Sequence, residues 1–321
     1  MAAPNIPIRH RPIFEGLESG EAKNEAAMKE YETLKGADHN GLDYANKTSM
    51  WIAFERDIES RRDDRLFNDP LAKHFIEPYG KRLSDAMAFG LQFGVFDPPG
   101  ANIGLGMEGH VMYTAARTRL VNDYIEKWFN DAKGDKKQMV NLGAGVDTRP
   151  YWLSCLSRAT SYWEVDTENV MKYKQLKLDL LKERKELPDP MCPIHSISMD
   201  FSKESIADLP KHNFDSSIPS CWLLEGLIMY MLRADVEQLI DAISQLAPSS
   251  SYLILNFSTN MPYTSSPSID ELDERLNASN WKKVVRLMFG EEGFRFNRYP
   301  EGKPANKILG FAMYEKVWTK G

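Results

Sequence analysis

The segment QMVNLGAG, residues 138–145, decides the fold class of this chain. A short apolar run that ends in a glycine turn is typical of a strand whose carboxyl end approaches a ligand. Further strand patterns occur at 161–166, 192–199, 220–226 and 251–257, and helical patterns cover 168–187 and 234–246. Strands that alternate with helices predict an α/β protein with a doubly wound, Rossmann-like sheet that is mostly parallel.

The regions on either side of this alternation predict further elements. Towards the C-terminus, apolar spacing predicts a helix over 269–289 and a last strand near 308–318. Towards the N-terminus, the spacing predicts a long helix over 108–129, short helices between 50 and 96, and a helix over 21–36 that Gly36 closes. We therefore expect three parts, which are an N-terminal arm or lid (1–45), a helical cap that contributes to a substrate pocket (46–107), and a ligand-binding core (108–321).

Composition excludes several classes of protein. The 321 residues include 40 Lys and Arg against 46 Asp and Glu, and the net charge of −6 argues against a nucleic-acid partner. No run of 18 uncharged apolar residues is present, so we expect no membrane partner. The three cysteines form no C-x-x-C pair and the six histidines show no H-x-x-x-H spacing, which predicts no metal site and favours a reduced, cytoplasmic compartment.

The glycine turn and the acidic residues behind it predict an adenosine-type ligand. Gly143, Ala144 and Gly145 form a turn that a ligand can approach closely and from which helix N–H groups can point at it. Glu164 and Asp166 follow Gly145 by 19 and 21 positions, where a carboxylate can accept both ribose hydroxyls. A purely structural turn is the alternative.

The third glycine of a dinucleotide-binding fingerprint is missing. Thr148 stands where that fingerprint needs Gly or Ala for close packing of the helix. This disfavours a nicotinamide-dependent or flavin-dependent oxidoreductase, which stays open as a less favoured alternative.

Four blocks carry a more specific resemblance. They are RLFNDPLAKHF (65–75), AARTRLVNDYI (115–125), VNLGAGVDTRPYWL (140–153) with YWEVD (162–166), and WLLEGLIMYM (222–231). In this order they resemble the leucine carboxyl methyltransferase family, a class of S-adenosylmethionine-dependent methyltransferases that includes small-molecule O-methyltransferases. The resemblance implies S-adenosyl-L-methionine as the cofactor. It also implies a seven-stranded sheet with one antiparallel strand and an N-terminal helical cap.

The resemblance also implies roles for single residues. Gly143 and Gly145 would approach the methionine part of the cofactor, and Asp166 would hold the ribose. Asp200 and the backbone of Phe201 would meet the adenine, although Asp200 could instead cap the short helix that follows it.

Charged residues in or before the same blocks could hold the charged end of the cofactor. Arg117 would pair with the cofactor carboxylate and Arg56 would lie near the same end, unless both belong to solvated helix faces. Glu225 ends a predicted strand, where its carboxylate could accept a hydrogen bond from the cofactor ammonium.

The acceptor chemistry divides into two cases. Methyl transfer to a carboxylate needs no base, whereas transfer to a hydroxyl does, and His110, Tyr113 and Tyr230 are the candidates by chain position. Both tyrosines could be core residues and His110 could simply open a helix. Arg149 could steer an anionic acceptor or belong to a structural ion pair.

The sequence as a whole predicts a methyltransferase that acts on an oxygen of a small molecule. The Met and aromatic content of DAMAFGLQFGVF (85–96) could line an apolar acceptor pocket, although helix packing also explains it. A protein's C-terminal leucine carboxylate is the alternative acceptor. A non-catalytic scaffold that binds an adenosine ligand is the alternative of another class.

Overall fold

The computed structural model describes residues 16–36, 44–93, 109–259 and 266–318. The chain forms two compact units. The helical unit comprises Met1–Arg119, Gly145–Thr148 and Phe289–Ile308. The sheet unit comprises Leu120–Ala144, Arg149–Met288 and Leu309–Gly321.

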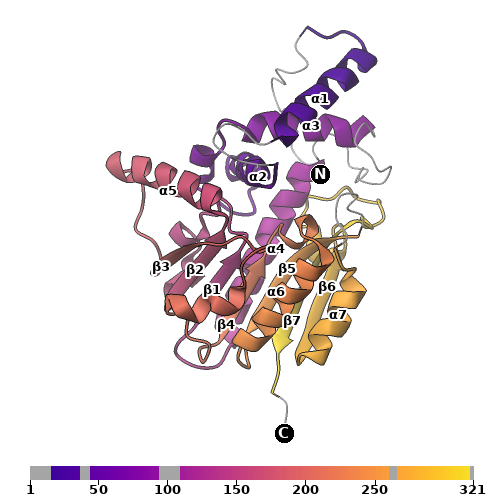
Figure 1. Ribbon diagram of the computed structural model, residues 1–321. Coiled ribbons are helices and arrows are strands. Elements are labelled where there is room, and N and C mark those ends of the chain that lie inside the picture. Colours follow the sequence, from indigo (N-terminus) through magenta and orange to yellow (C-terminus); the bar gives the residue numbers. More distant parts are fainter. Residues whose placement is uncertain (1–15, 37–43, 94–108, 260–265, 319–321) are drawn as a thin grey trace. The chain divides into compact units, whose positions relative to one another are not determined.

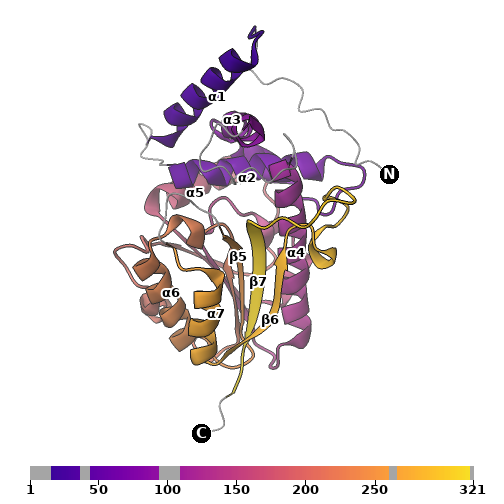
Figure 2. The same ribbon diagram turned by 90° about the vertical axis from the view of Figure 1, so that its right-hand side faces the viewer.

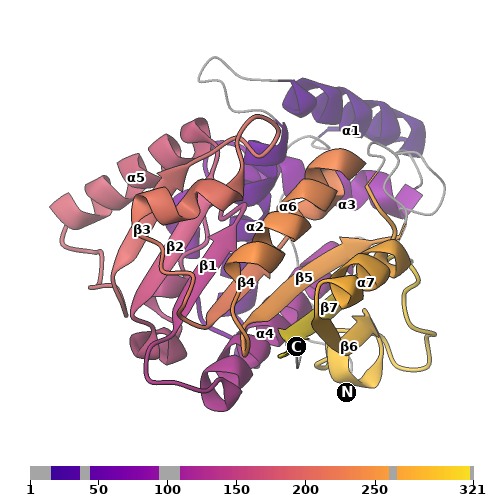
Figure 3. The ribbon, with the colours of Figure 1, turned by 60° about the horizontal axis from the view of Figure 1, so that its bottom comes forward.

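One seven-stranded sheet forms the centre of the sheet unit. Its strands are β1 (Gln138–Leu142), β2 (Ser161–Asp166), β3 (Ile194–Ser198), β4 (Ser220–Leu224), β5 (Tyr252–Ser258), β6 (Trp281–Met288) and β7 (Leu309–Lys316). They lie in the order β3-β2-β1-β4-β5-β7-β6, which can be followed in Figure 3. The pairs from β3 to β5 are parallel, and β7 runs antiparallel to both β5 and β6. The predicted mostly parallel sheet with one antiparallel strand is confirmed.

Amphipathic helices cover the sheet. They are α5 (Glu168–Glu183), α6 (Arg233–Leu246), α7 (Ile269–Ala278) and α4 (Gly109–Asp131), of which the residues from Leu120 belong to this unit. Figure 2 shows α6 and α7 on one face of the sheet and α4 on the other. The buried stripe of α6 includes Val236, Ile240 and Ile243, at the spacing that places side chains on one helix face. A capping box between Ser268 and Glu271 fixes the start of α7.

Short 3-10 helices complete the sheet unit. They are η3 (Arg149–Tyr151), η4 (Ser154–Arg158), η5 (Ile206–His212) and η6 (Ile228–Tyr230).

The prediction of one helix over 269–289 is wrong. Helix α7 ends at Ala278, Asn280 takes a left-handed conformation with φ of 65°, and the chain returns as β6. Strand β6 is an edge strand, so its solvent-facing positions carry Lys282, Lys283 and Arg286 instead of apolar residues. Because of these charges, the segment lacks the alternation of apolar and polar residues that indicates a strand. Its pattern therefore resembles that of a helix.

Helices make up most of the helical unit. They are α1 (Gly20–Lys35), α2 (Tyr44–Ser60), η2 (Ala72–Phe75), α3 (Gly80–Phe93), the first part of α4, and η7 (Glu292–Phe294). Helix α3 lies between α1 and α2 (Figure 2). Tyr31 and Leu34 of α1, Trp51 of α2 and Leu83 of α3 form a buried apolar cluster.

Part of the expected N-terminal arm forms helix α1. Residues 20–35 form a helix that buries Tyr31 and Leu34, which makes this part of the segment a packed element rather than a tail. Gly36 ends α1 with φ of −71°, so the helix does not use the left-handed glycine cap that the sequence predicts. The rest of the predicted arm lies largely outside the described residues, and the division into arm, cap and core stays a prediction. Among the described helices, none combines the length and apolar character that crossing a membrane requires.

Candidate active site

The carboxyl ends of the central strands gather the polar residues of the sheet unit. Strand β1 lies between β2 and β4 and is parallel to both (Figure 1). The chain goes outward from β1 to β2 and β3 in one direction, and to β4 and β5 in the other. Ligands of open α/β sheets bind at such a switch point, beyond the carboxyl ends of the strands. The turns after β1, β2 and β4 therefore lie where such a ligand would bind.

The glycine turn after β1 is demanded by the fold itself. Gly143 and Gly145 have φ of 67° and 51°, a conformation that favours glycine. The amides of Gly143 and Ala144 donate to the carbonyl of Val165 at 2.8 and 3.2 Å. A Cβ atom on Gly143 would lie 2.9 Å from Cδ1 of Leu227.

The turn does not lead directly into an α-helix. The 3-10 helix η3 is the next helical element after it. The expectation that helix N–H groups point from this turn is therefore wrong, because no helix begins there and two of its amides bond within the sheet unit.

The two predicted acidic residues of β2 have different environments. Glu164 is buried, and its carboxylate binds Nζ of Lys174 and accepts from the Ser196 hydroxyl at 2.7 Å. Asp166 is half-buried at the end of the strand, where its Oδ1 accepts from the amide of Thr167 at 2.7 Å. Of the two carboxylates, Asp166 is the more exposed and lies at the carboxyl end of the strand.

Tyr151, in η3, is unsuited to serve as a base. Burial raises the pKa of the Tyr151 hydroxyl to about 12, and the charge of Glu164 adds to the shift. A phenol with this pKa stays protonated at neutral pH and cannot accept a proton there.

The loop after β3 holds Asp200 within a turn. Its Oδ1 accepts from the amide and hydroxyl of Ser202 at 3.0 and 2.6 Å, and its Oδ2 lies 2.6 Å from Nζ of Lys203. The hydrogen bond from Lys203 and those from Ser202 lower the pKa of this carboxyl to about 2. Phe201 is partly buried against the core of the sheet unit. Both oxygens of Asp200 thus bond within this turn. The alternative that Asp200 caps a following helix is wrong, because the next helix is η5, which begins at Ile206 and is capped by Ser205.

An ion pair fixes the segment after β4. Nη1 of Arg149 lies 2.7 Å from Oε2 of Glu225, and its Nε donates to Oδ1 of Asn122 at 2.7 Å. The amide of Gly226 donates to Oδ1 of Asn256 at 2.5 Å. The sequence left Arg149 open between steering an acceptor and a structural ion pair, and the structure brings it together with Glu225 in such a pair.

In the helical unit, Arg56 is engaged by buried carboxylates. Its Nη2 donates to Oδ1 of Asp147 at 2.9 Å, and its Nε lies 3.6 Å from Oδ2 of Asp69. Oδ1 of Asp69 accepts from the Thr148 hydroxyl at 2.6 Å and from the amides of Leu71 and Ala72. Thr148, which departs from the dinucleotide fingerprint, thus joins the segment 145–148 to this network. Arg56 lies in the network and not on a solvated helix face.

The aromatic candidates lie in different surroundings. Tyr113 is buried against Phe289 and Phe294, and the Arg117 guanidinium lies 5.3 Å from the centre of its ring. Tyr113 therefore has the core position that sequence reasoning left open as its alternative, and the buried Arg117 lies on no solvated face. Tyr230 is half-buried at the end of η6 in the sheet unit.

His110 has a partner that sequence reasoning missed. Its Nδ1 lies 2.7 Å from Oε2 of Glu55, and its ring stacks on Trp51 with centroids 4.0 Å apart. Glu55 is buried in α2 and comes 55 positions earlier in the chain. The spacing W-x-x-x-E in α2 was the available signal, because residues four apart on a helix share a face. Their common neighbour on α4 could not be read from it.

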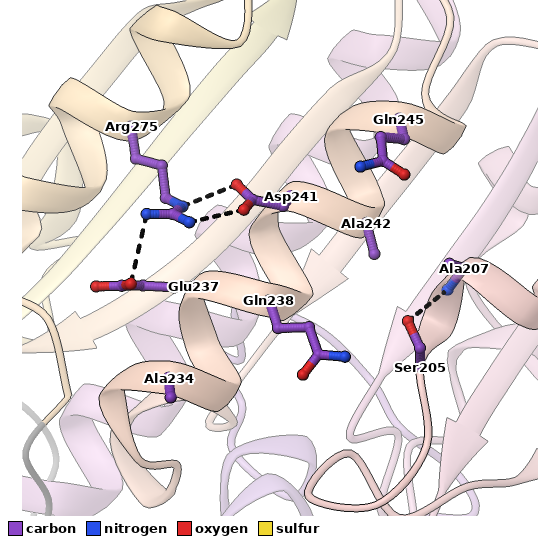
Figure 4. A pocket seen from close by; sticks show the side chains of 9 residues that line it. All are labelled: Ser205, Ala207, Ala234, Glu237, Gln238, Asp241, Ala242, Gln245 and Arg275. Carbon is purple, nitrogen blue, oxygen red and sulfur yellow. Dashed lines mark hydrogen bonds and ion pairs between the residues drawn. The ribbon is translucent and has the colours of Figure 1, made fainter.

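The sheet unit also has a surface hollow, and other residues line it. It has a volume of about 440 Å³ and lies between η5, α6 and α7 (Figure 4). The positively charged side chain that lines it belongs to Arg275. Nη2 of Arg275 lies 2.6 Å from Oδ2 of Asp241, and its Nη1 lies 3.5 Å from Oε2 of Glu237. None of the predicted site residues lines the hollow.

The chain is similar to known proteins over much of its length. Residues 49–244, more than half of the chain, match the family described as Leucine carboxyl methyltransferase. A protein of Parafrankia sp. (strain EAN1pec) is 29% identical over 65% of this chain, and the match spans 62% of that protein, just under two thirds of its length. A protein of Mycolicibacterium vanbaalenii is 31% identical over 67% of this chain and 69% of that protein. Both relatives carry the name "Putative S-adenosyl-L-methionine-dependent methyltransferase".

A solved structure adds a distant likeness. The crystal structure of a DUF574 family protein from Streptomyces avermitilis is 14% identical and covers 82% of this chain and 96% of that chain, with a TM-score of 0.48. The sequence match over 49–244 decides the family, and it contains all four blocks that carry the resemblance. The chain belongs to the leucine carboxyl methyltransferase family.

Proposed function

We propose that this protein is an S-adenosyl-L-methionine-dependent methyltransferase that methylates an oxygen atom of a small molecule. Its family and the names of its relatives support the reaction class. The observation that carries the proposal is the half-buried carboxylate of Asp166 at the carboxyl end of β2, next to the switch point of the sheet.

The carboxylate at this edge of the sheet fits the ribose of the cofactor. A carboxylate accepts hydrogen bonds from two neighbouring hydroxyls, and the ribose of S-adenosyl-L-methionine offers such a pair. Glu164 is closed by Lys174 and Ser196, which leaves this role to Asp166. Arg149 and Asn256 hold the segment of Glu225 and Gly226 in place. Arg149 binds one oxygen of Glu225, and the resemblance assigns this carboxylate to the cofactor ammonium.

The remaining assignments rest on the resemblance. S-adenosyl-L-methionine supplies, when bound, a methyl group on a positively charged sulfur. Arg117 would bind the cofactor carboxylate. Arg56 would act indirectly, because Asp147 and Asp69 already hold its guanidinium.

The small-molecule acceptor rests on DAMAFGLQFGVF, whose side chains from residue 88 onward lie outside the described residues. A cytoplasmic location completes the proposal. It agrees with three buried, free cysteines, and burial raises the pKa of the Cys155 and Cys192 thiols to about 11.

Calorimetric titration tests the proposal. We expect the chain to bind S-adenosyl-L-methionine and its demethylated product, and not NAD⁺. Asp166→Ala should weaken cofactor binding by about 2 kcal/mol or more, or about 30-fold, because charge-assisted bonds to the ribose are lost. Asp208→Ala is the matched control, since Asp208 is an exposed η5 residue paired with Lys211. Unchanged affinity in Asp166→Ala would contradict the site assignment, and binding of NAD⁺ alone would contradict the function.

A further inference from the structure

Helix α5 of the sheet unit carries an apolar stripe on its exposed side. Leu176 and Leu180 are 59% and 39% exposed, and among the residues that the structure describes no other helix carries two exposed large apolar side chains. Tyr173 is half-buried and precedes Leu176 by three positions. Residues three, four and seven apart share a helix face, so Tyr173, Leu176 and Leu180 form one apolar stripe.

The other side of α5 fixes the direction of this stripe. Lys174 is buried, and its Nζ binds the carboxylate of Glu164 in β2. Leu178 and Leu181 are buried as well. The helix is therefore already held on the sheet unit, and a partner that meets the stripe need not order the helix first.

Residues of opposite charge lie at the two ends of the apolar stripe. Lys172 comes four positions before Leu176 and Glu183 comes seven positions after it, so both lie on the same helix face as the stripe. Nζ of Lys172 lies 2.7 Å from Oε1 of Glu168, and both of these side chains are largely exposed. Glu183 is exposed and has no ion-pair partner in the described part of the chain. The stripe thus has a cation at its amino end and an available anion at its carboxyl end.

This face is complementary to a second copy of itself that lies antiparallel. When Leu176 of one copy meets Leu180 of the other, Lys172 of one copy lies opposite Glu183 of the other, because the two pairs have nearly the same midpoint in the helix. Two-fold symmetry makes each of these contacts twice. Parallel packing would instead place like charges opposite each other at both ends, which disfavours it.

We propose that the apolar stripe of α5, with Lys172 and Glu183 at its ends, is a self-association surface that joins two copies of this chain through antiparallel α5 helices. The occupant is a second copy because the same helix supplies both members of each charge pair and both sides of the apolar contact. One helix face is small beside the surface of about 800 Å² per partner that stable interfaces bury. The dimer is therefore weak and reversible, and it forms at high protein concentration.

Sedimentation of the full chain tests whether the dimer exists. At low ionic strength, which preserves contacts between exposed charges, we expect a monomer–dimer equilibrium that is evident at about 100 μM protein. A chain that stays monomeric under these conditions would overturn the proposal.

Leucine variants test whether the dimer uses this face. Leu176→Gln and Leu180→Gln keep a good helix former at each position, and two-fold symmetry makes each change act twice. Each should raise the dissociation constant of the dimer about tenfold or more, because less apolar surface leaves water on association. Leu232→Gln is the matched control, since Leu232 is also 59% exposed but lies outside α5, and it should leave the dimer unchanged. A dimer that both α5 variants leave intact, or that Leu232→Gln weakens as strongly, would contradict the proposal.

Charge reversal tests the antiparallel pairing. Lys172→Glu and Glu183→Lys each place like charges opposite each other in a dimer of that variant alone, so each variant should dimerise about fivefold more weakly than the unmodified chain. In a mixed dimer of the two variants, opposite charges face each other at both contacts. Sedimentation of an equimolar mixture, with one variant carrying a fluorescent label, should therefore show mixed dimers at least as stable as those of the unmodified chain. A mixture that associates no better than either variant alone would show that Lys172 and Glu183 do not pair between copies, and the proposal would be wrong.

Discussion

Two glutamates of α2 lie one helical turn apart and have opposite surroundings. Glu55 and Glu59 are each 1% exposed. Glu59 accepts from Nε and Nη2 of Arg298 at 3.1 and 2.7 Å, and from the amide of Leu66 at 2.7 Å. Glu55 has an indole, a hydroxyl and an imidazole in place of a guanidinium.

The two buried carboxylates differ in whether their partner is a permanent cation. A guanidinium is always charged and offers a fixed fork of donors, so Arg298 is a permanent counter-charge for Glu59. An imidazole carries a charge only when it is protonated, so the Glu55–His110 contact is not a permanent ion pair. Equal burial of two carboxylates therefore does not imply equal contributions to stability, because their partners differ in charge.

Loss of the Glu59 charge should have the largest effect on the free energy of unfolding. Glu59→Gln should lower the free energy of unfolding by about 3–5 kcal/mol, because the buried Arg298 loses its main counter-charge. Glu55→Gln, whose partners are neutral donors and an imidazole, should cost about 1–3 kcal/mol. Denaturant unfolding of both variants measures the difference.

A control on Arg298 sharpens this comparison. Asp64 also binds Arg298, at 3.2 Å, but its side chain is 48% exposed. Asp64→Asn should cost less than about 1 kcal/mol, as exposed ion pairs usually do. Equal losses in Glu59→Gln and Glu55→Gln would show that the two glutamates do not differ in the way their partners suggest.

Ser49, a third residue of α2, lies close to the backbone of Gly145. A Cβ atom on Gly145 would lie 2.9 Å from Cβ of Ser49, and φ at this glycine is 51°. Gly145→Ala should therefore lower the free energy of unfolding by about 1–3 kcal/mol. Gly302→Ala is the control and should cost less, since Gly302 has φ of 75° and a Cβ atom there would meet no atom within 4 Å. If the two variants lose equally, the approach of Gly145 to Ser49 adds nothing to the backbone strain.

The sequence predicts the sheet better than the site. Periodicity places β1, β2, β4 and β5 to within a few residues, because buried parallel strands read as apolar runs. It fails at β6, where an edge strand carries charges on its open positions. The resemblance points to Arg56 and Asp166, but it does not predict that buried carboxylates of the protein itself bind Arg56.

The contacts that could not be predicted from the sequence join residues that are far apart in the chain. Glu55 meets His110 across 55 positions, and Glu59 meets Arg298 across 239. No periodicity connects residues so far apart, because only the folded helices bring them together. Glu55 and Glu59 are indistinguishable as letters in WIAFERDIES, and their different roles follow from the elements that pack against each.

The smallest expected effect concerns an ion pair at the surface, the counterpart of the buried pairs on α2. Asp200 binds Lys203, whose side chain is 77% exposed, and the pKa of the Asp200 carboxyl is lowered to about 2 from its ordinary 3.8. A lowered pKa contributes stability that is present above pH about 4 and is lost as the pH falls towards 2. Lys203→Met removes the largest cause of the shift, so the pKa of Asp200 should rise towards 3.8 while the Ser202 bonds keep it somewhat lower. The free energy of unfolding at pH 7 should change by less than about 0.5 kcal/mol, since solvent screens an exposed pair. Carboxyl NMR titration measures the pKa, and denaturant unfolding measures the stability. A loss as large as that of Glu59→Gln would mean that burial does not set the strength of ion pairs in this protein.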